Sequence, residues 1–369
     1  MKSLYKFIGV IAMVAALSAA CSKIGIPAGG SRNERGFTDL TVTLNAPETK
    51  VAGASASNEK AIQNVQVFVF RAGSGSDAGN LEVAVSAGFD SPLGVTTGTY
   101  NGITVKCSSG EREIWVVCND SADRTQGTVS TKAEFLSLTH ELVNSSASKL
   151  LMIGNVPAYT MTAGTETKAV DVKRMCAAIV LDSVTNSFIS PAYQAENTFR
   201  IEDIYIINVP AQVNFGSFTT PRLASSLGTD SWYAKMGKET TPAKQALTYE
   251  AKSGEGTILN YTSVHNTTHT FYLYPNECGA SENATWTTRA TLLVMEASIR
   301  NSAGTWTKYY YPVTIAPDGG IRSNSMYHVT MTIKRPGSND PNKPVTFNEV
   351  TAGISVSDWV DGGTTDKEI

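Results

Sequence analysis

Four histidines and five cysteines are the residues of this chain best suited to metal binding or nucleophilic chemistry. His265 and His269 are four positions apart and Cys278 follows them, a set that could supply zinc ligands. The letters NTTHTFYLY around the pair are typical of a loop leading into a strand, where a spacing of four does not place the side chains as a helix would. No P-loop, H-E-x-x-H or G-x-S-x-G motif is present. We therefore predict no catalytic residue, no metal site and no cofactor.

The N-terminus carries a targeting signal. Two lysines precede an apolar run from Phe7 to Ala20, and Cys21 follows at once. About 14 residues are too few to cross a bilayer, which takes around 20, so residues 1–20 are predicted to be a secretory signal peptide; a buried N-terminal helix is the alternative. Ser18-Ala19-Ala20-Cys21 resembles a bacterial lipobox, although Leu17 lies four positions before the cysteine rather than three. We predict lipidation at Cys21.

Four further cysteines form an even number in a chain with an export signal, which invites a disulfide hypothesis. Cys107 and Cys118 flank a turn-like SSGE and read as two strands of one hairpin. In such a hairpin Cys107 lies at the turn and Cys118 several residues along the other strand, well beyond the roughly 7 Å Cα limit of a disulfide. Cys176 and Cys278 lie in unrelated segments, so we predict no structural disulfide.

The elements that would have to position any site are almost all strands. Alternating polar and apolar residues, separated by Gly, Pro, Asn and Asp, recur along the chain. The one helical candidate is Thr131–Val143, and no βαβ alternation appears, so we predict an all-β fold of β-sandwiches. The predicted strands are Thr38–Leu44, Ile62–Phe70, Gly102–Cys107, Glu113–Cys118, Ala169–Lys173, Cys176–Val184, Ile201–Val209, Thr270–Tyr274, Thr291–Arg300, Thr305–Ile315 and Tyr327–Lys334.

Composition and length narrow the class of protein further. The 369 residues carry 30 Lys+Arg against 33 Asp+Glu, which excludes a strongly basic nucleic-acid binder. At about 100–200 residues per domain the length suggests two domains. We place them at 51–172 and 173–334, after a segment 21–50. The proline-containing linker KRPGSNDPNKP then sets off residues 335–369, and we predict that it holds this C-terminal segment away from the second domain.

The order of these pieces resembles the major fimbrillin family of Bacteroidia, the subunits of type V pili. After the lipobox-like cysteine come TDLTVTLNAPETK, NEKAIQNVQVFVF, VKCSSGEREIWVVCND and VKRMCAAIVLDSV, then YYYPVTI, IRSNSMYHVTMTIK and ISVSDWV. Each is an ordinary strand, and the specificity lies in their order. The resemblance covers nearly all of the chain after Cys21, except an insert at about 210–257. It implies two transthyretin-like β-sandwich domains in tandem with an extended C-terminal donor segment.

The resemblance also implies a structural function rather than an enzymatic one. Subunits of this family are exported as lipoproteins, with a lipid anchor in the outer membrane before maturation. They are then cut by a surface protease and polymerised with identical or related subunits into fimbriae. These fibres adhere to host or bacterial surface receptors. The expected location is the cell-surface fimbrium, with the outer-membrane lipoprotein as precursor and no nucleic-acid partner.

Maturation by proteolysis implies a cut site and a removable strand. The family cut lies in the loop after the first strand, which here corresponds to Lys50, where most members have Arg; Arg35 is the competing site. A cut at Lys50 removes Leu40, Val42 and Leu44 from one face of a sandwich strand and leaves an apolar groove. The predicted donor-strand residues, which follow Val345, are Phe347, Ile354, Val356, Trp359 and Val360. The alternative is that this segment completes its own domain.

Two other functions stay open at this point. One is the anchor or tip subunit of the same fimbrial system. The other is a surface carbohydrate-binding lipoprotein that never polymerises. The second would need clustered exposed aromatic residues, whereas the simpler interpretation is that strand residues alternate between core and surface. Its candidate residues are Trp232, Tyr233, Trp286, Trp306, Tyr309, Tyr310 and Tyr311.

Overall fold

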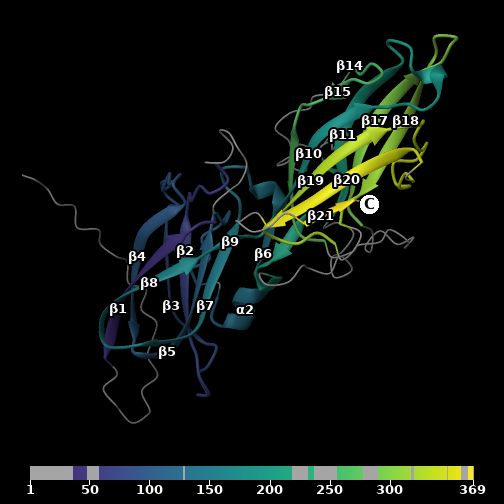
Figure 1. Cartoon of the computed structure of the whole chain (residues 1–369). Helices are drawn as coiled ribbons and strands as arrows, with labels where there is room; N and C mark the ends of the chain where they lie inside the picture. The colour runs from purple at the N-terminus through teal and green to yellow at the C-terminus, as the bar shows by residue number, and fades with distance from the viewer. Residues whose placement is uncertain are drawn as a thin grey trace, which may run out of the picture. The chain divides into compact units, whose positions relative to one another are not determined.

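The protein is described by a computed structural model over residues 36–47, 58–127, 129–217, 232–236, 256–276, 290–316, 320–346, 348–358 and 365–368. Strands make up most of these ranges and form two successive groups of sheets along the chain (Figure 1). This confirms the predicted all-β fold of two sandwiches. Among the described residues, no helix has the length and apolar character needed to span a membrane.

The first sandwich packs a three-stranded sheet, β4-β1-β8, against a five-stranded sheet, β3-β2-β5-β7-β9. Apolar side chains from both sheets, among them Leu40, Val105, Val67 and Val116, form one buried cluster. Apolar and polar residues alternate along these strands because every second side chain points into this layer. Their bounds are β1 Phe37–Asn45, β2 Val65–Arg71, β3 Leu81–Ala87, β4 Thr99–Ser108, β5 Gly110–Cys118, β7 Met152–Met161, β8 Gly164–Asp171 and β9 Lys173–Arg174.

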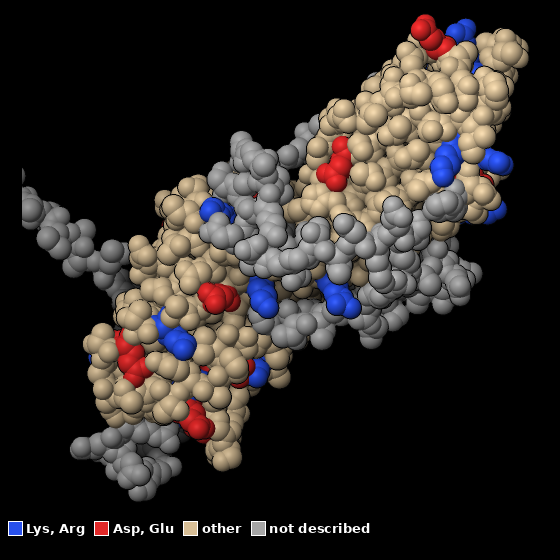
Figure 2. Space-filling model, in the orientation of Figure 1, with Lys and Arg blue, Asp and Glu red and all other residues tan. Residues whose placement is uncertain are grey.

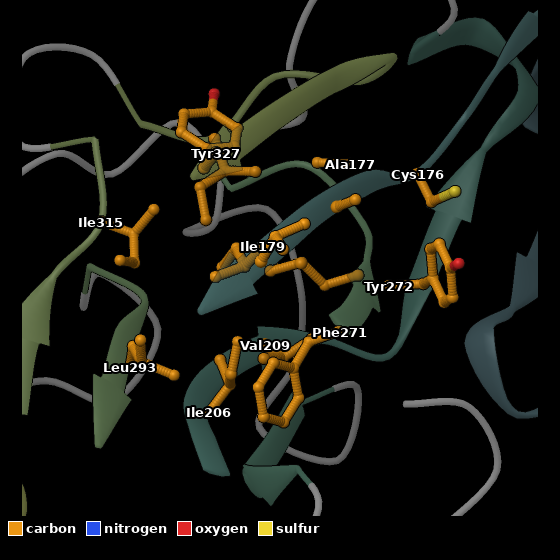
Figure 3. Packing of buried hydrophobic residues seen from close by; sticks show 14 of the residues in the cluster. Cys176, Ala177, Ile179, Ile206, Val209, Phe271, Tyr272, Leu293, Ile315 and Tyr327 are labelled. Carbon is orange, nitrogen blue, oxygen red and sulfur yellow. The ribbon is translucent and has the colours of Figure 1, made fainter. Parts of the chain in front are cut away.

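The second sandwich pairs a six-stranded sheet, β15-β10-β19-β20-β21 with β16 also on β10, and a five-stranded sheet, β13-β11-β17-β18 with β14 on β11. Ile179 and Phe271 of the first sheet pack with Ile206 and Leu293 of the second (Figure 3). The bounds are β10 Ala177–Asn186, β11 Phe199–Pro210, β13 Trp232–Met236, β14 Thr257–Ile258, β15 Val264–His265, β16 His269–Leu273, β17 Leu292–Arg300, β18 Trp306–Thr314, β19 Ser325–Ile333, β20 Val350–Asp358 and β21 Thr365–Glu368.

The predicted helix is much shorter than its apolar pattern suggested. Helix α2 covers only Lys132–Ser137, begins with a capping box in which the Thr131 hydroxyl accepts from the Glu134 amide, and ends at Leu138. The next residues form the short strand β6, Thr139–Glu141, which pairs with β12, Gln212–Asn214. The 3₁₀ turn η1 (Leu142–Asn144) follows β6, and the 3₁₀ turn η3 (Phe215–Ser217) follows β12. Pairing with β12 satisfies the backbone here, so tertiary contact overrides helical periodicity.

The predicted hairpin of Gly102–Cys107 with Glu113–Cys118 is wrong. Both segments are strands, but β4 pairs β1 in the three-stranded sheet whereas β5 pairs β2 and β7 in the other sheet. The chain crosses between the layers at Ser109, whose amide donates to the Gly36 carbonyl at 2.8 Å. Cys107, Cys118 and Cys176 are buried free thiols.

The buried side chain of His140 makes the stability of the fold depend on pH. Nδ1 of His140 lies 2.6 Å from the Tyr274 hydroxyl, and Nε2 lies 3.9 Å from the Asp120 carboxylate. Burial lowers the pKa of His140 from 6.5 to about 4; the charge of Asp120 opposes this shift, while Arg124 and Lys149 add to it. The unfolded chain therefore takes up this proton first as the pH falls, so the stabilisation is complete above pH 6.5 and is lost progressively toward pH 4.

We expect this one group to lower the free energy of unfolding by about 3 kcal/mol between pH 7 and pH 4, at about 1.4 kcal/mol per pKa unit. The His140→Asn variant keeps an acceptor near the Nδ1 position and lacks this slope. Urea unfolding of both proteins across this range measures the difference. His328 serves as the control because its pKa is shifted in the opposite direction. Its hydrogen bond to Asp182 raises its pKa, so the stabilisation that His328 contributes is present below pH 6.5 and disappears as the pH rises. Equal slopes in wild type and His140→Asn would contradict the prediction.

Candidate functional site

Strand β1, which holds the predicted removable residues, is the central strand of its sheet. It runs antiparallel to β4 on one side and parallel to β8 on the other. Leu40 faces Val105 of β4 and Glu166 of β8, so both backbone edges of β1 are paired. Taking this strand out would leave two facing strand edges, a template for adding another strand.

The predicted residues Leu40, Val42 and Leu44 all point into the first core and are fully buried, and they alternate with exposed or half-buried residues. Burying one such side chain contributes roughly 1.5–3 kcal/mol. The three therefore belong to the apolar layer between the two sheets. Partners in the same cluster include Val67, Val69, Val116, Met152, Met161 and Val170.

The two ends of β1 are fixed by hydrogen bonds. At the start, the Thr38 hydroxyl donates to the Thr162 carbonyl at 2.5 Å. At the exit, the Ala46 amide donates to the Gly98 carbonyl at 2.7 Å and the Val172 amide donates to the Asn45 carbonyl at 3.0 Å. Arg35 and Lys50, the predicted cut sites, and Cys21, the predicted lipid site, lie outside the described residues.

Cys107 of β4 lies beside β1 in the same sheet, and its sulfur is 4.0 Å from the Thr38 carbonyl oxygen. It is paired with Thr38 in the sheet register, and its sulfur lies 3.2 Å from the Met161 sulfur. Burial is the main cause that raises the pKa of this thiol to about 11. Because its sulfur contacts the first residues of β1, we expect Cys107 to report on whether the strand is in place.

The C-terminal segment lies in the sheet of its own domain. β20 pairs antiparallel with β19, and β21 pairs with β20. Val350 and Ile354 are buried in the second core, and Val356 is half-buried against it. Phe347, Trp359 and Val360 lie outside the described residues. The segment therefore completes its own domain here, which is the alternative that the sequence left open.

The linker does not hold this segment away from its domain, so that prediction is wrong. Tyr310 and Ser338 exchange two backbone hydrogen bonds of 2.8 Å, and the Val345 amide donates to the Pro312 carbonyl at 3.0 Å. A Cβ on Gly337 would lie 2.3 Å from the Tyr310 carbonyl oxygen, so glycine permits this close approach. The prolines and glycine that suggested a free linker shape a chain that packs along β18.

The histidine pair is close but forms no larger cluster. Nε2 of His265 and Nε2 of His269 are 3.4 Å apart, in β15 and β16 beside β10. Cys278 lies outside the described residues, and the described part of the chain contains no group of three or more His, Cys, Asp or Glu able to hold a metal.

The aromatic residues on β18 do not form one exposed platform. Tyr311 is fully buried, whereas Tyr309 and Tyr310 are half-buried. The Arg200 guanidinium lies over the Trp306 ring at 4.5 Å from its centre. The side chains of Trp232, Tyr233 and Trp286 are outside the described set. Burial along β18 does not strictly alternate: Thr307 and Lys308 are exposed, whereas Tyr311, Pro312 and Val313 are buried. Tyr310 packs against a small cluster of Tyr205, Ile207, Leu292 and Val294.

Charged side chains are sparse on the face shown in Figure 2. Lys and Arg lie singly among Asp and Glu over the described residues of this face, and neither sign gathers into a broad patch there. Steering of a partner by a large one-signed field is therefore not a feature of this face. The contact that the site itself offers is strand pairing at β1.

Comparison with known proteins places this geometry in a class. Residues 38–187 match the sequence model of the family described as major fimbrial subunit protein (FimA). The major fimbrium subunit FimA type-2 of Porphyromonas gingivalis is 25% identical over 308 residues, which cover 69% of this chain and 77% of that protein. A crystal structure of a fimbrilin from the same organism superposes with a TM-score of 0.58 at 20% identity, over 88% of this chain and 98% of that one.

A structure of the tip fimbrial protein Mfa3 of Porphyromonas gingivalis with a C-terminal truncation shares the fold, with a TM-score of 0.51 at 13% identity, over 88% of this chain and 100% of that truncated chain. The fold and the matches define a two-sandwich fimbrial subunit of the bacterial cell surface. More particularly, the chain is similar to the major fimbrillin family, as its order of strands had indicated.

Proposed function

We propose that this fimbrial subunit polymerises by exchange of β1 for the C-terminal segment of another copy. The single observation that supports this most is the place of β1: it is central in its sheet, pairs on both edges and buries Leu40, Val42 and Leu44. A strand of this kind fills a groove that is unfavourable when empty, because apolar faces and backbone groups are then exposed together.

The proposed sequence of events begins at the membrane. The precursor is exported as a lipoprotein on Cys21 and anchored in the outer membrane, and a protease then cuts at Lys50, as inferred from the family. The cut lies after the last described residue of this segment, Pro47, so it separates the whole of β1 from the remaining chain. A cut at Arg35 would release the lipid but leave β1 in place.

The donor segment must leave its own sheet before it can enter another subunit. β20 has β19 on one side and β21 on the other, so release breaks the β19·β20 ladder and exposes Ile354. This cost is recovered when the same backbone and apolar groups are buried between β4 and β8 of the next copy. The proposed exchange therefore replaces contacts within one molecule by contacts of the same kind between two molecules.

Electron microscopy after limited digestion with trypsin tests this proposal. The purified full chain should form no fibres before the cut, and fibres should appear after it, with an N-terminus at Val51. Fibres that begin at Gly36 and retain β1 would overturn the exchange. Antibody labelling along the shaft supports a stalk subunit, whereas labelling confined to one end supports the tip role suggested by the similarity to Mfa3.

The thiol of Cys107 should follow the fate of β1. We expect it to resist alkylation in the uncut chain, to react after the cut in dilute solution, and to be protected again in fibres. Loss of burial lowers the pKa of this thiol from about 11 toward its ordinary value and so raises the thiolate fraction near neutral pH. Mass-spectrometric mapping of alkylated cysteines gives the measurement. Cys176, buried in the second core, is the internal control. Unchanged Cys107 reactivity after a verified cut would contradict the removal of β1.

A further inference from the structure

Arg174 is a fully buried arginine at the end of the groove that β1 fills. It is the last residue of β9, pairs with Met152 of β7, and is among the largest fully buried side chains of the described residues. A guanidinium removed from water needs close hydrogen-bond acceptors to be tolerated. The acceptors of the Arg174 guanidinium therefore indicate the role of this buried charge.

Two of its acceptors are backbone carbonyls on opposite sides of the predicted cut. Nη2 donates to the Pro47 carbonyl at 2.9 Å, and Nε donates to the Glu59 carbonyl at 3.0 Å. Lys50 lies between these two residues in the sequence. Cutting there removes Pro47 together with β1 but leaves Glu59 in the chain.

The retained acceptor is itself firmly held. Glu59 is 1% exposed, and its carboxylate accepts from the Tyr272 hydroxyl at 2.5 Å. Tyr272 points to the opposite side of β16 from Phe271 and lies beside Cys176 (Figure 3). The guanidinium therefore keeps its Glu59 contact when β1 departs.

The Pro47 carbonyl, which the cut removes, lies just beyond the hydrogen-bond ladder between β1 and β8. The Val172 amide, just after β8, binds the carbonyl of Asn45, and Arg174 binds the carbonyl two residues further on. Alternate carbonyls of an extended strand point the same way. The Arg174 side chain thus continues the row of donors that β8 presents to β1.

We propose that Arg174 binds a backbone carbonyl of the incoming strand, supplied by a second copy of this chain, and thereby fixes how far that strand slides into the groove. This inference rests on the exchange of β1 proposed above. In an extended strand bound in this groove, one carbonyl accepts from the Val172 amide. The next carbonyl with the same orientation then lies where the Pro47 carbonyl was before the cut. Arg174 is then a positioning residue for assembly, because it specifies one register among those that a uniform backbone ladder would allow.

The test compares full-length Arg174→Met and Arg174→Lys with wild type after cutting with trypsin. Methionine has a similar volume and no donor, whereas lysine keeps the charge and one donating centre. We expect fibre growth to slow at least about tenfold in Arg174→Met, and Arg174→Lys to lie between this variant and wild type. Phe68→Leu, which weakens a core away from β1 where Phe68 packs against Phe135, controls for general loss of stability.

Hydrogen exchange in the fibres separates positioning from stability. In Arg174→Met fibres, we expect the Val172 amide to exchange at least about tenfold faster than in wild type while Thr167, in the middle of β8, stays protected. A uniform increase at both positions, or growth no slower than in Phe68→Leu, would overturn the role of Arg174. Should wild-type chains form no fibres after the cut, the proposed exchange fails as well, so the two failures are distinguishable.

Discussion

The Thr41→Cys, Thr104→Cys double variant, once oxidised, will be cut normally and will form no fibres until a reductant is added. A covalent link between these positions holds β1 in its groove after the backbone is cut. The acceptor groove then never opens, whatever the concentration of other subunits. Electron microscopy and light scattering of one cut sample, before and after reduction, give the measurement.

The geometry of this pair suits a disulfide. Thr41 of β1 and Thr104 of β4 are directly opposite in the antiparallel register, and their hydroxyl oxygens are 3.1 Å apart. Directly opposite residues have Cβ atoms about 4.5–5.5 Å apart, close to what a disulfide spans. Thr41 is half-buried and Thr104 is exposed on the sheet face away from the core, so the exchange of hydroxyl for thiol leaves the packed layer unchanged.

The single variant Thr41→Cys controls for the substitution itself and should assemble like wild type with or without reductant. The result also decides between the two cut sites. If maturation occurs at Arg35, β1 stays in the subunit, and the oxidised double variant should assemble as wild type does. Fibres from the oxidised, fully cut protein would therefore rule out the departure of β1.

The strands were predictable because alternation directly records which face of a sheet is buried. TDLTVTL gives β1 its inward Leu40, Val42 and Leu44, and the register of those side chains agrees with the sequence pattern. Strand β3 was missed because both of its faces are half-buried, which removes the contrast between positions. β7 was missed because Gly154 and Pro157 interrupt its apolar pattern.

Pairing between strands was much less predictable than the strands themselves. The SSGE turn suggested a hairpin, but one residue, Ser109, carries the chain from one layer to the other. Which sheet a strand joins depends on contacts far along the chain, such as that of β1 with β8, and no local pattern records these. The same limit applied to the C-terminal segment, whose apolar residues predicted a strand but not its partner.

Arg174 shows why the site was only partly visible in the sequence. A single arginine before a strand gives no pattern, and its neighbours in the chain do not reveal its burial. Its meaning comes from Pro47 and Glu59, which are more than a hundred residues earlier and are brought to it by the fold. The sequence could place the removable strand, whereas the donor that completes its ladder required the three-dimensional arrangement.

Release of the donor segment is the second step that a covalent lock should stop. Thr332 of β19 and Thr351 of β20 are directly opposite, and both are half-buried. We expect the oxidised Thr332→Cys, Thr351→Cys double variant to be cut, to lose β1 and to remain monomeric, because its own β20 cannot leave. Reduction should restore fibre growth to the level of the single variant Thr351→Cys.

A lock is a sharper test than removal of the segment. Val350 and Ile354 belong to the second core, so deletion of residues 345–369 would remove core side chains and expose β19, and failure to assemble could then reflect loss of folding. The oxidised variant keeps all these contacts, and Cys107 should become reactive after the cut because its groove stands open.

A mixture of locked and wild-type chains offers a further check. Locked, cut chains should accept the C-terminal segment of wild-type subunits and yet donate none, so they should terminate growing fibres. Unhindered growth by the oxidised protein would show that β20 stays in its own sheet and that another segment fills the groove.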